Sequence, residues 1–304
     1  MNKIKKTLYW MTRPLVKNHL TGNLGKVVED DEKLTCYVRK HKIRRKDYHY
    51  TIVCFGIDEK QKKLAEAYNL NKPICYVIDG IEFKHTVYIF GYNNCEIVVK
   101  NCKLGITPTI RVNGKCTVEN SNIITFSYLS LSANELVIKN MDFDQIRIVS
   151  KESTLGFGGV NKIDIINSNI GSKDKDVSVS MLTKNEINII NSNIYGEEII
   201  CESNEINVDE KSTLNGNQKV DIKTKEFNQI NVNTPVIFLN GEEIPNERQV
   251  STITKIKEPL AIKRLELVTL LKKIKNKCEN IQEEKISRYE ENLQRTKIRK
   301  ILKK

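Results

Sequence analysis

Side chains that could perform acid–base or metal chemistry are sparse and scattered in this sequence. The four histidines stand at positions 19, 41, 49 and 85, and their spacing matches no metal-binding signature. Asp142, Asp144 and Asp164 are the best acidic candidates for a calcium or catalytic site, but no basic residue can be assigned to them as a partner. We therefore interpret them as solvated turn acids. The prediction is a protein without catalytic residues, metal or cofactor.

A dense basic run offers the clearest binding chemistry, and tyrosines lie on either side of it. Its members are Arg39, Lys40, Lys42, Arg44, Arg45 and Lys46. Such a run can neutralise phosphates of nucleic acid or of anionic lipid, and the tyrosines can stack on bases. No nucleic-acid-binding motif lies beside it, so a solvated hairpin loop is the competing interpretation.

The amino terminus offers a second contact surface. Trp10 lies between Tyr9 and Met11 and follows three lysines at positions 3, 5 and 6. An amphipathic anchor on a membrane surface is one interpretation, and a basic arm that packs locally or stays disordered is the other. The apolar part ends at Pro14, which is too short for a signal-peptide core, and no apolar run of 18 residues occurs. We expect a cytoplasmic protein, peripheral at a membrane if Trp10 acts as an anchor.

A repeated sequence motif lies between Ile97 and Leu214, and it predicts the scaffold that must position the candidate side chains. Its clearest form is Glu-Ile-x-Ile-x-Asn-Ser-Asn-Ile, and Glu210 takes the place of the first asparagine in the last of six copies. The other five copies align on Asn101, Asn120, Asn140, Asn167 and Asn191. Three positions in each of the six copies lie four residues before, two residues before and three residues after the asparagine position. Of these 18 residues, 17 are apolar. A chain that is 39% hydrophobic would give about seven by chance, so the repeat is a structural unit.

The spacing of the apolar positions predicts the coil of a solenoid. The two positions before the asparagine differ by two and share one face of a strand, whereas the position after it lies an odd step away. The chain must therefore turn at the asparagine, which tolerates the left-handed region. A repeat of roughly 20 residues is too short for a strand and a helix in every unit, and the leucine-rich signature is missing. The sequence predicts a mainly β fold, a parallel β-helix.

Asparagines aligned at a corner below stacked Ile and Val resemble the asparagine ladder of right-handed parallel β-helix proteins such as the pectate lyases. The resemblance covers residues 74 to about 240 and concerns the fold. It implies, as an alternative function, a glycan-binding or glycan-cleaving protein, similar to a polysaccharide lyase or glycoside hydrolase if it is an enzyme. Bactofilins are similar in being cytosolic β-helices with mobile ends, but their coils are shorter and more regular.

These patterns divide the chain into three segments. Residues 1–73 form a basic region in which 33–39 and 48–55 could pair as a hairpin and a helix from Lys60 to Leu70 caps the solenoid. Residues 74–245 form the β-helix, with a loop pushed out of one coil at 154–159. Residues 246–304 contain a linker and a basic amphipathic helix. Its apolar seam either caps the last coil or mediates self-association; the seam residues are Leu267, Leu271, Ile274, Cys278 and Ile281.

The net positive charge lies at the two ends of the chain, and the cysteine spacing agrees with a reduced cytoplasmic protein. Residues 1–73 hold 17 basic and 8 acidic residues, and residues 260–304 hold 14 and 6, whereas the solenoid between them is mildly acidic. None of the eight cysteines has Cys-x-x-Cys spacing, so reduced core thiols are expected. We expect a non-catalytic scaffold whose basic termini contact a partner, an anionic membrane surface or nucleic acid.

Overall fold

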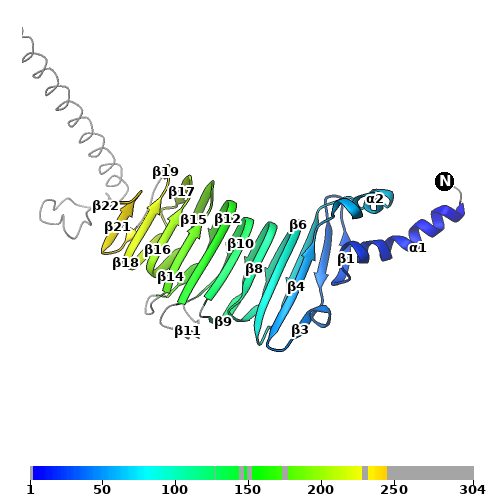
Figure 1. Cartoon of the computed structure of the whole chain (residues 1–304), viewed down its shortest axis with the longest axis horizontal. Helices are drawn as coiled ribbons and strands as arrows, with labels where there is room; N and C mark the ends of the chain where they lie inside the picture. The colour runs from blue at the N-terminus through cyan, green and yellow to red at the C-terminus, as the bar shows by residue number, and fades with distance from the viewer. Residues whose placement is uncertain are drawn as a thin grey trace, which may run out of the picture. The chain divides into compact units, whose positions relative to one another are not determined.

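The computed structural model describes residues 3–126, 128–143, 147–148, 153–172, 177–227 and 232–244. The chain forms two units, 1–254 and 255–304, and all described residues belong to the first. This unit is a β-solenoid of about seven turns with parallel strands, as the repeat predicted (Figure 1). The expected C-terminal helix and its apolar seam, like Asp144, lie outside the described residues.

Each complete coil has three sides, named A, B and C in chain order. Side A comprises β4 (His49–Phe55), the first halves of β6 (Thr86–Lys100), β8 (Thr109–Glu119), β10 (Tyr128–Lys139) and β12 (Ser153–Ile166), then β14 (Val177–Leu182), the second halves of β16 (Asn193–Glu202) and β18 (Thr213–Lys223), and β21 (Val236–Leu239). Side B comprises β2 (Leu34–Val38), β5 (Ile74–Asp79), the second halves of β6, β8, β10 and β12, then β15 (Glu186–Ile190), β17 (Glu205–Val208) and β19 (Glu226–Phe227). Side C comprises β7 (Lys103–Ile106), β9 (Asn122–Phe126), β11 (Arg147–Ile148), β13 (Asn169–Gly171), the first halves of β16 and β18, and β20 (Val232–Asn233).

Short antiparallel strands and two helices complete the unit at its ends. β1 (Gly25–Glu29) pairs with β2, β3 (Arg44–Lys46) with β4, and β22 (Glu242–Ile244) with β21. The helices are α1 (Lys3–Leu20) and α2 (Glu59–Ala67), with a 3-10 turn at Lys40–Lys42. Asp58 begins α2 through a capping box with Gln61. These antiparallel strands cover the first strands of sides A and B and the last described strand of side A.

The core consists of the apolar columns that the repeat predicted. All 17 apolar residues of those columns are buried, and most of them have no exposed surface. The exception is the sixth copy, in which Thr213 faces outward and Leu214 pairs with Ile194 of the preceding coil. One extra residue after Asp209 causes this shift, because the side-chain period of a strand is two.

The corner between sides B and C is built as the sequence predicted. The five repeat asparagines have φ between 47° and 52°, in the left-handed region. Asn140 Nδ2 donates to Asn120 Oδ1 at 3.0 Å, and Asn191 Nδ2 donates to Asn167 Oδ1 at 2.9 Å. Asn101 donates instead to Asp79 Oδ1 of the preceding coil at 2.8 Å. The polar corner residues therefore join neighbouring coils outside the core.

The structure corrects three expectations for single segments. Segments 33–39 and 48–55 do not pair with each other; β2 stacks on β5 and β4 stacks on β6, both in parallel, so stacking begins before residue 74. Consequently α2 connects side A to side B within the first coil, where Ala65 and Leu70 are buried. The glycine-rich run 154–159 lies inside β12 and not in an extruded loop. Local hydrophobic pattern does not say which of several strands becomes the neighbour.

Candidate functional site

Helix α1 is held to the rest of the unit by its polar face. Tyr9 stacks on Tyr68 with ring centroids 5.1 Å apart and donates a hydrogen bond to the Tyr68 carbonyl oxygen at 2.8 Å. One turn further, Arg13 and Lys17 each lie 2.6 Å from Glu29 Oε2 on β1. Val16 and Leu20 on the same side pack against the core. The segment is helical and packs locally along one side, whereas the membrane contact of Trp10 stays a prediction.

The opposite face of α1 is apolar and faces solvent. Leu8, Met11 and Leu15 follow the helical spacing of three and four residues, and their exposed fractions are 61%, 70% and 67%. Trp10 is 59% exposed on the flank of the helix next to the anchored residues, with the Arg13 guanidinium 5.8 Å from its ring centroid and the Tyr9 ring at 5.6 Å. A helix on a soluble core normally buries its apolar face. In α1 Val16 and Leu20 pack against the core, but the row of Leu8, Met11 and Leu15 faces solvent.

Glu29 is the residue that fixes this orientation. Burial of its carboxyl raises the pKa, but hydrogen bonds from Arg13, Lys17 and Lys72 outweigh burial and lower the pKa to about 2. Lys72 Nζ lies 3.2 Å from Glu29 Oε1, so cations from α1 and from the segment before β5 share one carboxylate. No local sequence pattern indicates this cluster, because its members are 12 to 43 residues from Glu29 along the chain.

The basic run lies in the 3-10 turn and in β3, the strand that forms a hairpin with β4. Arg39, Lys40 and Lys42 lie in and around the 3-10 turn, Arg44, Arg45 and Lys46 form β3, and all six are exposed. Within the described residues none of the six forms an ion pair with an acid. Arg45 lies 5.9 Å from the Tyr50 ring centroid and 3.3 Å from His85 Nε2. The positive charge of this hairpin is therefore available to an anionic partner.

Asp164 lies on a strand and serves a structural network. Lys162 Nζ lies 3.3 Å from Asp164 and 3.4 Å from Glu186, one coil further along side B. Asn188 Nδ2 donates to both carboxylates, at 2.8 and 2.9 Å. The interpretation of Asp164 as a solvated turn acid is therefore wrong. Asp142 forms a parallel bridge with Asn169 beside the asparagine corner. No group of three metal-ligating side chains occurs among the described residues.

The described cysteines are buried thiols. Seven of them, at 36, 54, 75, 95, 102, 116 and 201, are free and buried. Burial raises the pKa of the Cys36 and Cys95 thiols to about 11 and of the Cys75, Cys116 and Cys201 thiols to about 12. Because the thiolate is the reactive form, these side chains act as small apolar core residues and not as nucleophiles. Cys278 lies outside the described residues.

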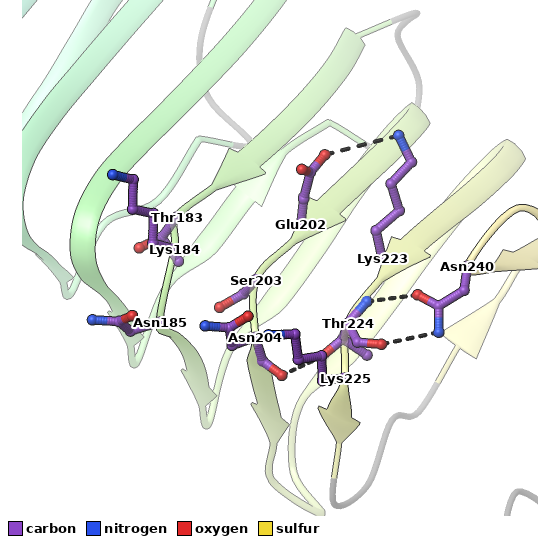
Figure 2. A pocket seen from close by; sticks show the side chains of 10 residues that line it. All are labelled: Thr183, Lys184, Asn185, Glu202, Ser203, Asn204, Lys223, Thr224, Lys225 and Asn240. Carbon is purple, nitrogen blue, oxygen red and sulfur yellow. Dashed lines mark hydrogen bonds and ion pairs between the residues drawn. The ribbon is translucent and has the colours of Figure 1, made fainter.

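Two shallow grooves lie along the corner between sides A and B. One, of about 560 Å³, is lined near the last described coils by three lysines, three asparagines and Glu202. Figure 2 shows the ion pair between Lys223 and Glu202, whose charged atoms are 3.8 Å apart. It also shows that the Asn240 side chain accepts a hydrogen bond from the Thr224 backbone N–H and donates one to the Thr224 carbonyl oxygen. The other, of about 600 Å³, lies between Phe90 and Leu182. Neither groove is lined by the two carboxylates that glycoside hydrolysis uses.

The comparisons with known proteins leave the chain without an assigned relative. No family model, no curated protein and no solved structure matches this sequence. Among the described residues no helix is both long enough and apolar enough to cross a bilayer.

Proposed function

We propose that the protein is a non-catalytic scaffold, a rigid solenoid whose N-terminal end lies on an anionic membrane surface. The observation that carries this proposal is the orientation of α1, in which Arg13 and Lys17 are anchored to Glu29 while Leu8, Met11 and Leu15 face outward and Trp10 is exposed on the flank. Three large apolar side chains in water on one helical face are unfavourable unless a partner covers them.

Charge complementarity supports an anionic bilayer as the partner. Lysines 3, 5 and 6 precede the apolar row, and residues 1–73 carry 17 basic against 8 acidic residues. An amphipathic helix lies in the interface with its apolar face among the acyl chains, and each nearby Lys or Arg contributes roughly 1 kcal/mol on an anionic leaflet. Anionic lipids face the cytoplasm, so we place the scaffold on the cytoplasmic leaflet.

The solenoid itself supports a structural role. Its strands pair in parallel from β2 to β21, and corner side chains join successive coils outside the core. Acids on its surface are used in ion pairs, such as Asp164 with Lys162 and Glu198 with Lys219 at 3.2 Å. A stack in which every coil supports the next is suited to holding attached partners at fixed separations.

Vesicle binding tests the proposal directly, because Trp10 is the single tryptophan in the chain. The full-length protein should sediment with phosphatidylserine–phosphatidylcholine vesicles, and Trp10 emission should shift to shorter wavelength. The triple variant Leu8→Gln, Met11→Gln and Leu15→Gln should lose at least tenfold in vesicle affinity while keeping its melting temperature, since all three side chains already face solvent.

A matched control uses exposed apolar residues of the solenoid. Val160→Gln and Leu182→Gln remove side chains that are 46% and 45% exposed, and vesicle affinity should stay unchanged. Equal binding by the triple variant and the native protein, or no binding by the native protein, would refute the proposal. Binding to pure phosphatidylcholine at the same affinity would retain the apolar contact but contradict the role of charge.

A further inference from the structure

Sides A and B of the solenoid differ in charge along six consecutive coils. The side A segments are 49–55, 86–92, 109–113, 128–134, 153–158 and 177–182, and they contain no Asp or Glu. The matching side B segments each contain at least one acid, namely Asp79, Glu96, Glu119, Glu135, Asp164 and Glu186. We call the outward side chains of the six side A segments the acid-free face. Acids return in the next coil of side A, at Glu198 and Glu202.

An aromatic row stands on this face. Tyr88, Phe90 and Tyr92 alternate along β6 with the buried residues Val87, Ile89 and Gly91, so all three point outward, roughly 6.6 Å apart. Tyr88 and Phe90 are nearly parallel with centroids 6.3 Å apart, and Tyr92 stacks on Phe55 of β4 at 5.5 Å. The row therefore presents successive flat rings to solvent along one strand.

Cations border the aromatic row on both sides. Arg44 and Lys46 of β3 are paired with Thr51 and His49 of β4. Residues opposite each other in an antiparallel pair share a face, so Arg44 and Lys46 lie on the acid-free face. His49 contacts the Tyr88 ring at 5.6 Å. On the other side, Arg111 of β8 is in register with Phe90 and exposed. Among the described residues neither arginine nor Lys46 forms an ion pair.

Beyond Arg111 the face is hollowed. In register with Arg111 stand Ser132 and Gly158, and Leu182 follows one coil later. These residues and Phe90 line the groove of about 600 Å³. A Cβ placed on Gly158 would meet only the Ser132 Cβ, at 3.4 Å, so space above the glycine is open. A bound polymer that lay along these strands would contact the aromatic and cationic side chains at one edge and the small residues Ser132 and Gly158 beneath it.

We propose that the acid-free face binds single-stranded nucleic acid, with bases stacked on Tyr88, Phe90 and Tyr92 and phosphates held by Arg44, Lys46 and Arg111. Aromatic rings accept every base, and a groove with cations and no acids follows a phosphate backbone without reading sequence. A double helix would not present its base faces to the row, which favours the single strand. This binding surface does not use α1 and is independent of membrane attachment.

Anisotropy of a labelled oligothymidylate, titrated with the full-length protein at several salt concentrations, tests the proposal. Phe90→Ser should weaken binding at least fivefold through lost stacking. Arg111→Gln should weaken binding and reduce the slope of log affinity against log salt by about 0.7, the value for one phosphate contact on a single strand. Two matched controls lie on side B: Lys115→Gln, on the same strand as Arg111, and Tyr37→Ser, which removes a tyrosine that is 44% exposed.

Gly158→Leu keeps the test valid if Phe90→Ser fails to fold, because it fills the groove and leaves every aromatic and cation in place. It should also weaken binding at least fivefold. Three results would overturn the proposal: no binding by the native protein at physiological salt, equal losses in the side B controls, or duplex DNA bound as tightly as the single strand. Tighter binding of an acidic polysaccharide, with the same dependence on Phe90 and Arg111, would assign the face to glycans instead.

Discussion

At the residue scale, the corners at Asn120, Asn140, Asn167 and Asn191 use the asparagine and the buried serine or methionine after it for different tasks. The asparagine supplies the left-handed turn on the outside. The next residue points inward, and its side chain accepts a backbone N–H from the preceding coil: Ser121 from Cys102 at 3.0 Å, Ser168 from Met141 at 3.1 Å and Ser192 from Ser168 at 3.0 Å. A buried column of hydroxyl groups thus satisfies donors that the turn leaves without strand partners.

Ser168→Ala is therefore expected to destabilise the protein more than its size suggests. It leaves the buried Met141 N–H without a partner, which should lower the free energy of unfolding by about 1–3 kcal/mol. Asn167→Ala places alanine at φ 49° and should cost roughly 1–2 kcal/mol. Urea unfolding measures both changes. Ser130→Ala, half-exposed on side A, is the control; a Ser168 variant as stable as this control would contradict the role of the hydroxyl column.

At the element scale, ion pairs fix the orientation of α1 together with the burial of Val16 and Leu20. Arg13, Lys17 and Lys72 converge on Glu29, whose side chain is only 14% exposed, and this cluster holds the polar face inward. The apolar row is thereby presented outward on a helix that is already folded and fixed. Such pre-organisation reduces the ordering cost of binding to a surface.

Acid should release α1 before it unfolds the solenoid. The pKa of Glu29 is lowered from its ordinary 4.5 to about 2, so the stabilisation it provides is complete above about pH 4.5 and is lost as the pH falls towards 2. Trp10 fluorescence anisotropy should decrease over this range while the β-sheet circular dichroism persists.

Glu29→Gln provides the matching test at neutral pH. Trypsin should cleave after Lys17 severalfold faster in this variant, because Arg13 and Lys17 both lose their charged partner and the helix is held less firmly. Glu32→Gln, an exposed acid close by, should leave the cleavage rate unchanged. A Glu29 variant with native protease resistance would show that Tyr9, Val16 and Leu20 suffice to hold the helix.

At the scale of the whole unit, stability is built from contacts between neighbouring coils. The parallel stack has no single centre, and a central coil has partners on both sides: Ile165 is in register with Ile138 and Ile189. Residues near the end have fewer such partners. In a stack of this kind the loss of one central coil interrupts the core on both sides of it.

Ile165→Ala should lower the free energy of unfolding by about 2–5 kcal/mol, because the site is fully buried and its neighbours are fixed by the strand register. The melting temperature measured by circular dichroism reports the loss. Ile166→Ala, the half-exposed neighbour that points outward, is the control and should change the melting temperature much less. Equal effects of the two substitutions would contradict the register of β12.

The amino-acid sequence by itself determined the solenoid coil, because the same local pattern recurs in every coil and each copy specifies the same inward and outward positions. The asparagine corners and the 17 buried column residues followed from this repetition. The helix from Asp58 was also local information, since its cap and its end lie within a few residues.

Only the tertiary structure decided what depends on residues distant in sequence. The apolar spacing in α1 suggested a contact face but not that Glu29 and Lys72 would hold the opposite face inward. The strands around the basic run were recognisable, yet their partners were β5 and β6 and not each other, because stacking selects a neighbour one coil away. The groove beside Phe90 exists because Arg111, Ser132 and Gly158 align across coils about 20 residues apart, a register that no single segment encodes.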